Sequence, residues 1–344
     1  MKARLRLGLP FALPFALPFA FPLGALAQPG ASAKASGRPL RILQVTYRGL
    51  TDVERGFLDH FRQRGLRVEF SHVDIALDTS RLPAVVQGIR SNPPDLISSW
   101  GSGVTLGLAG PWAAPDPARF ITDIPIVFSL VAEPVGAGIV PALASSGRQL
   151  TGVSHMASVA AQYQVMAAYR PFRRVGMVYS ANEPNSLAVL AQWRSLGRER
   201  GFEVLAQPFA RDASGKPMLE GALDRLRALR EQGAEWLYLP PDSFLSTQLK
   251  TVLPAALALG LPSFASTEPQ MRAGALLGLV SRYFSVGQFA GYKAEQILVQ
   301  GVPPSKIPIE TLSRMALQVS LPVARQLRLL PPLGFFNQAE LIDP

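Results

Sequence analysis

Residues 40–47 read Leu-Arg-Ile-Leu-Gln-Val-Thr-Tyr, a short apolar run rich in residues that favour β-strands. A helix is predicted directly after it, beginning behind Thr51, which can cap it, and ending at Gly65. The apolar face of this helix is formed by Val53, Phe57, Leu58 and Phe61. A strand that leads straight into an amphipathic helix predicts a parallel sheet covered by helices.

The alternation continues along the chain in two successive sets. The first set has further strands at 66–70, 95–99, 124–129 and 150–154, with helices at 82–89 and 135–143. The second set has helices at 159–169, 186–200, 218–231, 243–259 and 285–298, and strands at 174–179, 202–207, 235–239, 262–265, 275–280 and 307–310. Such alternation is typical of parallel sheets buried on both faces.

Two sets predict an α/β fold with two doubly wound parallel-sheet lobes joined by hinge strands, and 344 residues suit two domains of ordinary size. The expected lobes are residues 40–152 with 268–301, and residues 153–267 with 302–335. The expected hinge crossings lie near residues 151–152, 265–266 and 301.

The first 27 residues are predicted to be a signal peptide. Lys2, Arg4 and Arg6 precede an uncharged stretch over 7–26, and Ala25-Leu26-Ala27 fits a cleavage site. A membrane anchor is the alternative, but prolines recur every four residues from Pro10 and oppose a long spanning helix. Residues 28–39 are predicted to be a flexible leader. A periplasmic location follows.

Composition narrows the possible functions. Hydrophobic residues make up 48% of the chain and charged residues 17%, which suits large buried cores. The absence of cysteine excludes a disulfide scaffold and a catalytic thiol. The three histidines lack metal-ligand spacing, which argues against a zinc enzyme. No metal and no cofactor are expected. Cleavage of the signal leaves 31 basic and 24 acidic residues, a net charge of +7 without long basic runs, so nucleic-acid binding is not expected.

Polar and aromatic residues gather in the loops that follow the predicted strands. Because ligands of parallel sheets bind beyond the carboxyl ends of the strands, these loops predict a binding cleft between the lobes. The candidate ligand-binding residues are Tyr47, Trp100, Ser102, Ser129, Tyr179, Glu183, Asn185, Ser186, Asp242 and Ser266.

Several of these loops have two interpretations. The run Trp-Gly-Ser-Gly at residues 100–103 suits either an anion cradle at a helix N-terminus or a plain tight turn. The loop 179–186 suits a zwitterion with an organic side chain, or helix capping alone. Asp242 is an N-cap or an ammonium anchor. Glu133 is a helix cap or a contact at the rim of the cleft.

No catalytic residue is predicted. The chain has no Gly-x-Ser-x-Gly motif, and Ser154 beside His155 does not by itself arrange a catalytic triad. The polar groups in the loops bind, and none is poised to react.

The sequence resembles a known family in several stretches. These are residues 123–140 (Asp-Ile-Pro-Ile-Val-Phe-Ser onwards) with Leu-Thr-Gly-Val-Ser at 150–154, the loop from Tyr179 to Ser186, and Gly-Ala-Leu at 274–276 with Gly287. Together they are similar to ABC transporter substrate-binding proteins of the tryptophan/tyrosine type, over about residues 40–330. The resemblance implies a type I periplasmic-binding-protein fold and no enzymatic activity. It also implies delivery of a small solute, an aromatic or other amino acid, to an inner-membrane permease with a separate ATPase.

The expected function is therefore that of a monomeric solute-binding protein that closes around a small molecule. A ligand sensor with the same lobes and a membrane receptor as its partner is one alternative. An exported hydrolase is another, although it lacks a candidate for its reactive group.

Overall fold

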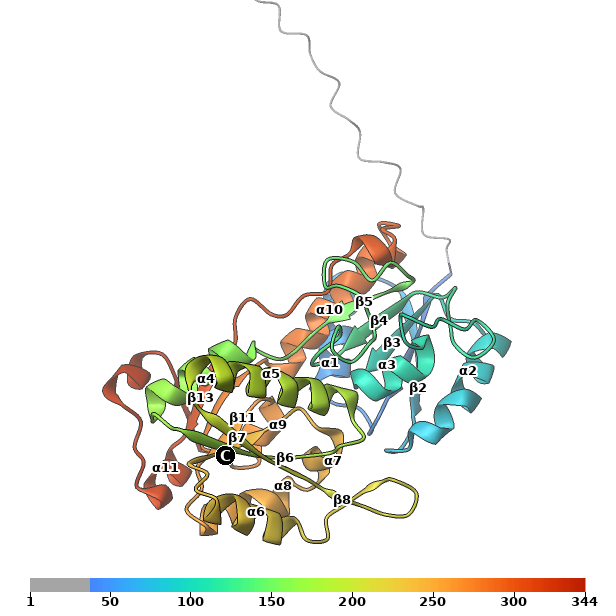
Figure 1. The fold of residues 1–344 in the computed structure, drawn as a ribbon. Coiled ribbons are helices and arrows are strands. Elements are labelled where there is room, and N and C mark those ends of the chain that lie inside the picture. Colours follow the sequence, from blue (N-terminus) through green and yellow to red (C-terminus); the bar gives the residue numbers. More distant parts are fainter. Residues whose placement is uncertain (1–37, 344) are drawn as a thin grey trace, which may run out of the picture.

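Two β-sheets, one in each lobe, organise residues 38–343, which are the residues that this computed structural model describes (Figure 1). The predicted signal peptide and nearly all of the predicted leader lie outside the described residues. The predicted fold class is confirmed, because both sheets are mainly parallel and helices cover both of their faces.

The first sheet is fully parallel, with the order β2-β1-β3-β4-β5. Its strands are β1 (Leu40–Thr46), β2 (Val68–Asp74), β3 (Leu96–Trp100), β4 (Ile126–Ser129) and β5 (Leu150–Val153). Helices α2 (Leu82–Ser91) and α3 (Gly101–Ala109) pack on one face, through a core shared with Leu43 and Val45. Helices α1 (Asp52–Gln63) and α10 (Tyr283–Leu298) pack on the other face, around Ile42.

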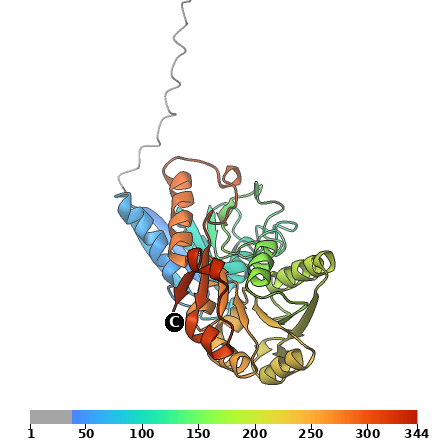
Figure 2. The same ribbon diagram turned by 90° about the vertical axis from the view of Figure 1, so that its left-hand side faces the viewer.

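Helices α1 and α10 lie side by side although more than 200 residues separate them in the chain (Figure 2). Two glycines permit this approach. A Cβ atom at Gly56 would lie 1.9 Å from the carbonyl oxygen of Phe284, and one at Gly287 would lie 1.9 Å from that of Val53. The predicted cap of α1 is confirmed, because Thr51 and Glu54 form a capping box.

The second sheet has the order β14-β13-β12-β11-β10-β6-β7. Its strands are β6 (Arg174–Tyr179), β7 (Glu203–Pro208), β10 (Trp236–Leu239), β11 (Ser263–Ala265), β12 (Leu277–Val280), β13 (Ala316–Ser320) and β14 (Glu340–Ile342). Helices α4 (Val159–Tyr169), α5 (Pro184–Arg200) and α11 (Leu321–Leu327) cover one face. The other face carries α6 (Ala222–Glu231), α7 (Ser243–Thr247), α8 (Leu249–Ala258) and α9 (Glu268–Arg272).

The chain crosses between the lobes in three segments: 154–158 after β5, 281–282 after β12, and 310–315 before β13. Isolated bridges join Val153 to Glu310 and Met156 to Val280, so the crossings lie next to one another. Two of the expected crossings were misplaced. Because β12 pairs with β11 in the second sheet, residues 277–280 belong to lobe 2, and the second crossing follows them. Because the 3₁₀ turn Pro304–Lys306 contacts β5, the third crossing follows Glu310.

Other predicted elements also differ from the structure. Residues 135–143 form turns instead of a helix, because Pro134, Gly136, Gly138 and Pro141 interrupt the apolar pattern. The predicted helix 243–259 is broken at Gln248 into α7 and α8, while Pro254 lies inside α8. A two-stranded hairpin, β8 (Ala210–Arg211) with β9 (Pro217–Met218), was not predicted.

Candidate functional site

A cleft of about 420 Å³ lies between the two lobes, at the carboxyl ends of their parallel strands. Lobe 1 contributes the loop after β1 and the first turn of α3. Lobe 2 contributes the loops after β6 and β10 together with the hairpin residues Lys216 and Pro217. The cleft therefore collects loops from both lobes, as the strand order requires.

The N-terminus of α3 forms one wall of the cleft. Gly101 has a φ of +77°, a conformation that favours glycine, and residues 101–104 line the cleft. Trp100, the N-cap residue, gives no side-chain hydrogen bond to this helix. The first amide groups of a helix have no partner within it, so this wall offers N–H donors to an anion.

An aromatic pair and one arginine stand beside this helix end. The rings of Tyr47 and Trp100 stack with their centroids 6.1 Å apart and their planes at 12°. The guanidinium carbon of Arg48 lies 5.6 Å from the centre of the Trp100 ring. Among residues 38–343, Arg48 has no ion-pair partner. The cleft thus presents a flat apolar surface next to an uncompensated positive charge.

The base of the cleft narrows to a space of about 40 Å³, lined by Arg48 and by the crossing residue His155. Four buried polar atoms at or beside this space have no hydrogen-bond partner within residues 38–343: the Trp100 Nε1, the Ser129 Oγ, the His155 Nδ1 and the Thr267 Oγ1. Burial lowers the pKa of His155 to about 4, so the ring is neutral at neutral pH. Buried polar groups are normally paired, so these four favour a polar ligand.

Glu183 presents a carboxylate from lobe 2. Its oxygens accept hydrogen bonds from the backbone N–H groups of Ser243, at 3.0 Å, and Phe244, at 3.3 Å. Burial, followed by the negative charge of Asp242, raises the pKa of Glu183 to about 8. Within the described part of the chain no lysine, arginine or histidine pairs with it. A cation from a ligand would supply the missing charge.

The carboxylate of Asp242 forms its hydrogen bonds within lobe 2. Its buried carboxylate accepts hydrogen bonds from the Ser180 N–H at 2.6 Å, the Ser180 and Ser186 hydroxyls at 2.9 Å, and the Leu245 N–H at 2.8 Å. Burial raises the pKa of Asp242, although these donors oppose the shift. Of its two predicted roles, the structure supports the N-cap of α7.

The other predicted site residues fall into two groups. Tyr47, Trp100, Ser102, Glu183 and Asn185 line the cleft, with the Asn185 amide tied to the Pro241 carbonyl at 2.6 Å. The second group is buried without lining it. Tyr179 packs in the core of lobe 2, Ser186 is bonded to Asp242, and the Ser266 hydroxyl donates to the Leu239 carbonyl at 2.7 Å.

The cleft residues that were not predicted from the sequence include Arg48, Lys216, Phe244 and Tyr283. Arg48 could have been found, because it follows Tyr47 in the loop after the first strand. Lys216 and Tyr283 had no such signal, since one lies on the unpredicted hairpin and the other at a misplaced crossing.

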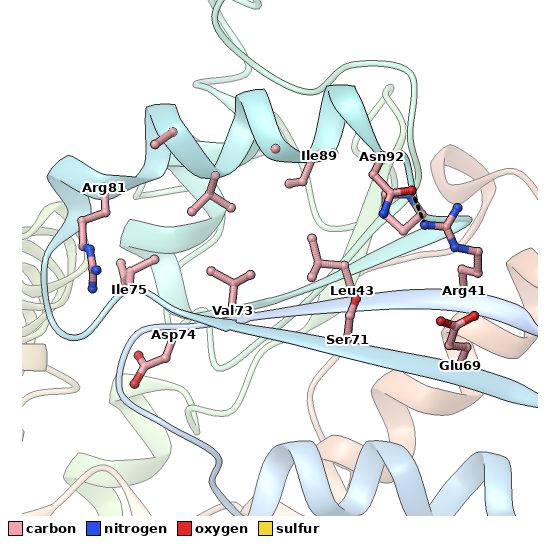
Figure 3. Close-up of a pocket in the computed structure, with 14 residues that line it drawn as sticks. Arg41, Leu43, Glu69, Ser71, Val73, Asp74, Ile75, Arg81, Ile89 and Asn92 are labelled. Carbon is pink, nitrogen blue, oxygen red and sulfur yellow. Dashed lines mark hydrogen bonds between the residues drawn. The ribbon is translucent and has the colours of Figure 1, made fainter.

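A separate cavity of about 560 Å³ lies under α2 (Figure 3). The apolar side chains of Leu43, Val73 and Ile89 face one another between α2 and the strands β1 and β2, with charged side chains at both ends. All of its lining residues come from lobe 1, so it is not part of the cleft.

The described residues contain no group of three or more His, Asp or Glu side chains able to hold a metal ion. None of the helices formed by residues 38–343 has the length and apolar character needed to cross a bilayer.

Known proteins are similar to this chain over most of its length. A tyrosine-binding protein of Clostridioides difficile is 22% identical over 275 residues, which cover 78% of this chain and 74% of that protein. An ABC domain from Streptococcus pneumoniae, solved in complex with L-Trp, superposes with a TM-score of 0.76 at 18% identity, over 88% of this chain and 99% of that one.

A ligand-free, open substrate-binding protein from Clostridium difficile superposes with a TM-score of 0.65 at 19% identity, over the same shares of the two chains. These likenesses confirm the type I periplasmic-binding-protein fold. The family model described as "ABC transporter substrate binding protein" matches residues 44–332, most of the chain. The resemblance found in the sequence is therefore confirmed, and the chain belongs to the family of ABC transporter substrate-binding proteins.

Proposed function

We propose that this protein is an exported, monomeric solute-binding protein that captures a free aromatic amino acid between its lobes. It would carry this ligand through the periplasm, after cleavage of its signal peptide near Ala27, to an inner-membrane permease driven by a separate ATPase. The observation that carries the choice of ligand is the set of groups in one cleft: a stacked aromatic pair, with an arginine and a carboxylate that form no ion pair within residues 38–343.

The carboxylate of the amino acid suits lobe 1. Arg48 can donate two parallel hydrogen bonds to it, and the amide groups at the start of α3 add further donors. Ser102, whose hydroxyl is a further potential donor, lies in the same wall. Both the charge and the donor geometry therefore favour an anion at this end of the cleft.

The ammonium group suits lobe 2. Glu183 faces the cleft with no basic partner among residues 38–343, and the neighbouring Asp242 adds negative potential. The ligand would thus be held by one charge from each lobe. Because contacts to both lobes exist together only when the lobes are close, binding favours the closed state.

The ligand side chain suits the aromatic part of the cleft. Tyr47 and Trp100 offer ring faces from lobe 1, and Phe244 lines the cleft from lobe 2. Stacking against such rings adds about 0.5–1.5 kcal/mol beyond the burial of area. The tyrosine-binding and L-Trp-bound relatives support the same ligand class. No group in the cleft is arranged to transform the ligand.

The ligand class can be tested by calorimetric titration of protein that has been unfolded and refolded to remove bound solutes. We expect L-tryptophan or L-tyrosine to bind at micromolar concentration or below. Tryptamine, which lacks the carboxylate, and indole-3-propionate, which lacks the ammonium, should each bind about 10- to 100-fold more weakly, since each loses a charge-assisted contact. If no aromatic amino acid binds at 1 mM while another solute does, the proposed ligand class is wrong.

The pH dependence of binding tests the role of Glu183. With a pKa of about 8, Glu183 is mainly protonated at pH 6 and half ionised at pH 8. An ammonium ligand needs the ionised form, so the affinity for L-tryptophan should rise about 50-fold from pH 6 to pH 8. Glu183→Gln should bind weakly with little change over this range. A flat profile in the unsubstituted protein would exclude Glu183 as the ammonium anchor.

A further inference from the structure

The crossing segment 154–158 has two sides. His155 points to the base of the ligand cleft, whereas Ser154 and Met156 line a different cavity of about 560 Å³. Alternate residues of an extended segment point in opposite directions, so this second cavity lies behind the hinge, away from the cleft. Residues of the loop after β4 alternate in the same way. Leu130 lines the base of the cleft, and Ala132 lines this second cavity, which we call the hinge cavity.

Both lobes and the crossing segments build this hinge cavity. Its apolar wall is formed by Met156, Leu279, Ile309, Leu312 and Met315. Two further apolar side chains of its lining, those of Val135 and Leu143, are 43% and 48% exposed. The two methionines are flexible and polarisable, and they can adapt to ligands of different shape.

One uncompensated charge faces the hinge cavity. Glu133 lines it, and within residues 38–343 no basic side chain forms an ion pair with Glu133. The second carboxylate of the lining, that of Glu310, is already paired with the Lys293 Nζ at 2.7 Å. Burial raises the pKa of Glu133, an effect that the Gln192 amide partly opposes. The lining contains no lysine, arginine or histidine.

Neither predicted role of Glu133 fits its position. The helix that it would cap does not form, and its side chain lies behind the hinge instead of at the rim of the cleft. A half-buried carboxylate with no basic partner in the described chain, set in an apolar wall, is costly unless a cation joins it.

We propose that the hinge cavity is a second ligand site, for an organic cation that carries one ammonium group on an apolar body. The ammonium would pair with Glu133, and the apolar body would pack on Met156, Met315 and Leu279. Such a ligand contacts segments that must bend when the lobes rotate. The proposal does not rest on the ligand of the main cleft.

The test uses protein labelled with ¹³C at the methionine methyl groups, and phenethylammonium as the probe. We expect saturable shifts of the Met156 and Met315 resonances, with the methyl groups of Met218 and Met271, which do not line the cavity, unchanged. The neutral 2-phenylethanol and the small methylammonium ion should each bind at least 10-fold more weakly. Absence of shifts at 10 mM phenethylammonium would overturn the proposal.

Three variants separate the hinge cavity from the cleft. Glu133→Gln should weaken the response at least 10-fold, and Ala161→Phe, which fills the cavity from α4, should abolish it. Glu183→Gln, which alters only the main cleft, should leave it unchanged. An undiminished response in Glu133→Gln, or its loss in Glu183→Gln, would overturn the proposal. The unchanged methionine resonances report that each variant is folded.

Discussion

Replacing Asp242 with alanine is expected to lower the free energy of unfolding by about 3–5 kcal/mol. The buried carboxylate accepts four hydrogen bonds, from Ser180, Ser186 and Leu245, that join the loop after β6 to the N-terminus of α7. Alanine leaves these buried donors without their acceptor, and each unsatisfied group costs about 1–3 kcal/mol. Denaturant unfolding followed by circular dichroism measures the loss.

The matched control is Asp224→Ala, which removes an aspartate whose side chain is 77% exposed on α6. Its ion pair with Arg227 lies on the surface, so the change should cost less than about 1 kcal/mol. Asp242→Asn keeps the shape and one acceptor, and it should fall between the two. A loss below 1 kcal/mol in Asp242→Ala would show that the four hydrogen bonds do not hold the loop and the helix together.

Replacing Arg48 with glutamine is expected to weaken the binding of L-tryptophan about 100-fold while leaving the fold intact. Hydrogen bonds to charged groups contribute about 1.5–3 kcal/mol, and Arg48 is the cation that shares the base of the cleft with the unpartnered polar atoms. The substitution breaks no ion pair, because Arg48 forms no ion pair within residues 38–343. Calorimetric titration measures the affinity, and thermal unfolding checks the fold.

Arg55→Gln is the control for this variant. Arg55 is 68% exposed on α1, pairs with Asp52 on the surface and does not line the cleft, so its loss should leave the affinity unchanged. An affinity of Arg48→Gln within threefold of the unsubstituted protein would show that another group holds the carboxylate.

Much of the fold could be predicted because its determinants are local. The apolar run of β1 and the capping Thr51 lie within a few residues of one another, and the structure contains both the strand and the cap. The position of the hinge crossings could not be predicted in this way. Whether β12 belongs to lobe 1 or lobe 2 depends on its pairing with β11 and β13, and nothing in its own sequence records that choice.

The binding residues, too, could be predicted only in part. Strand-end position placed Tyr47, Trp100 and Glu183 among the candidates, and the sheet topology brings them to one cleft. The sequence does not show, however, which way each of these side chains points. Asp242 and Glu183 look alike in sequence, but Ser180 and Ser186 engage the carboxylate of Asp242, while that of Glu183 faces the cleft.

The most direct test of the proposed binding mode is a crystal structure of the protein grown with L-tryptophan. We expect the unmodified amino acid between the lobes, with its carboxylate at Arg48 and the start of α3, its ammonium at Glu183 and its ring beside Trp100. L-Tryptophan bound to one lobe alone, found outside the cleft, or chemically altered would contradict it.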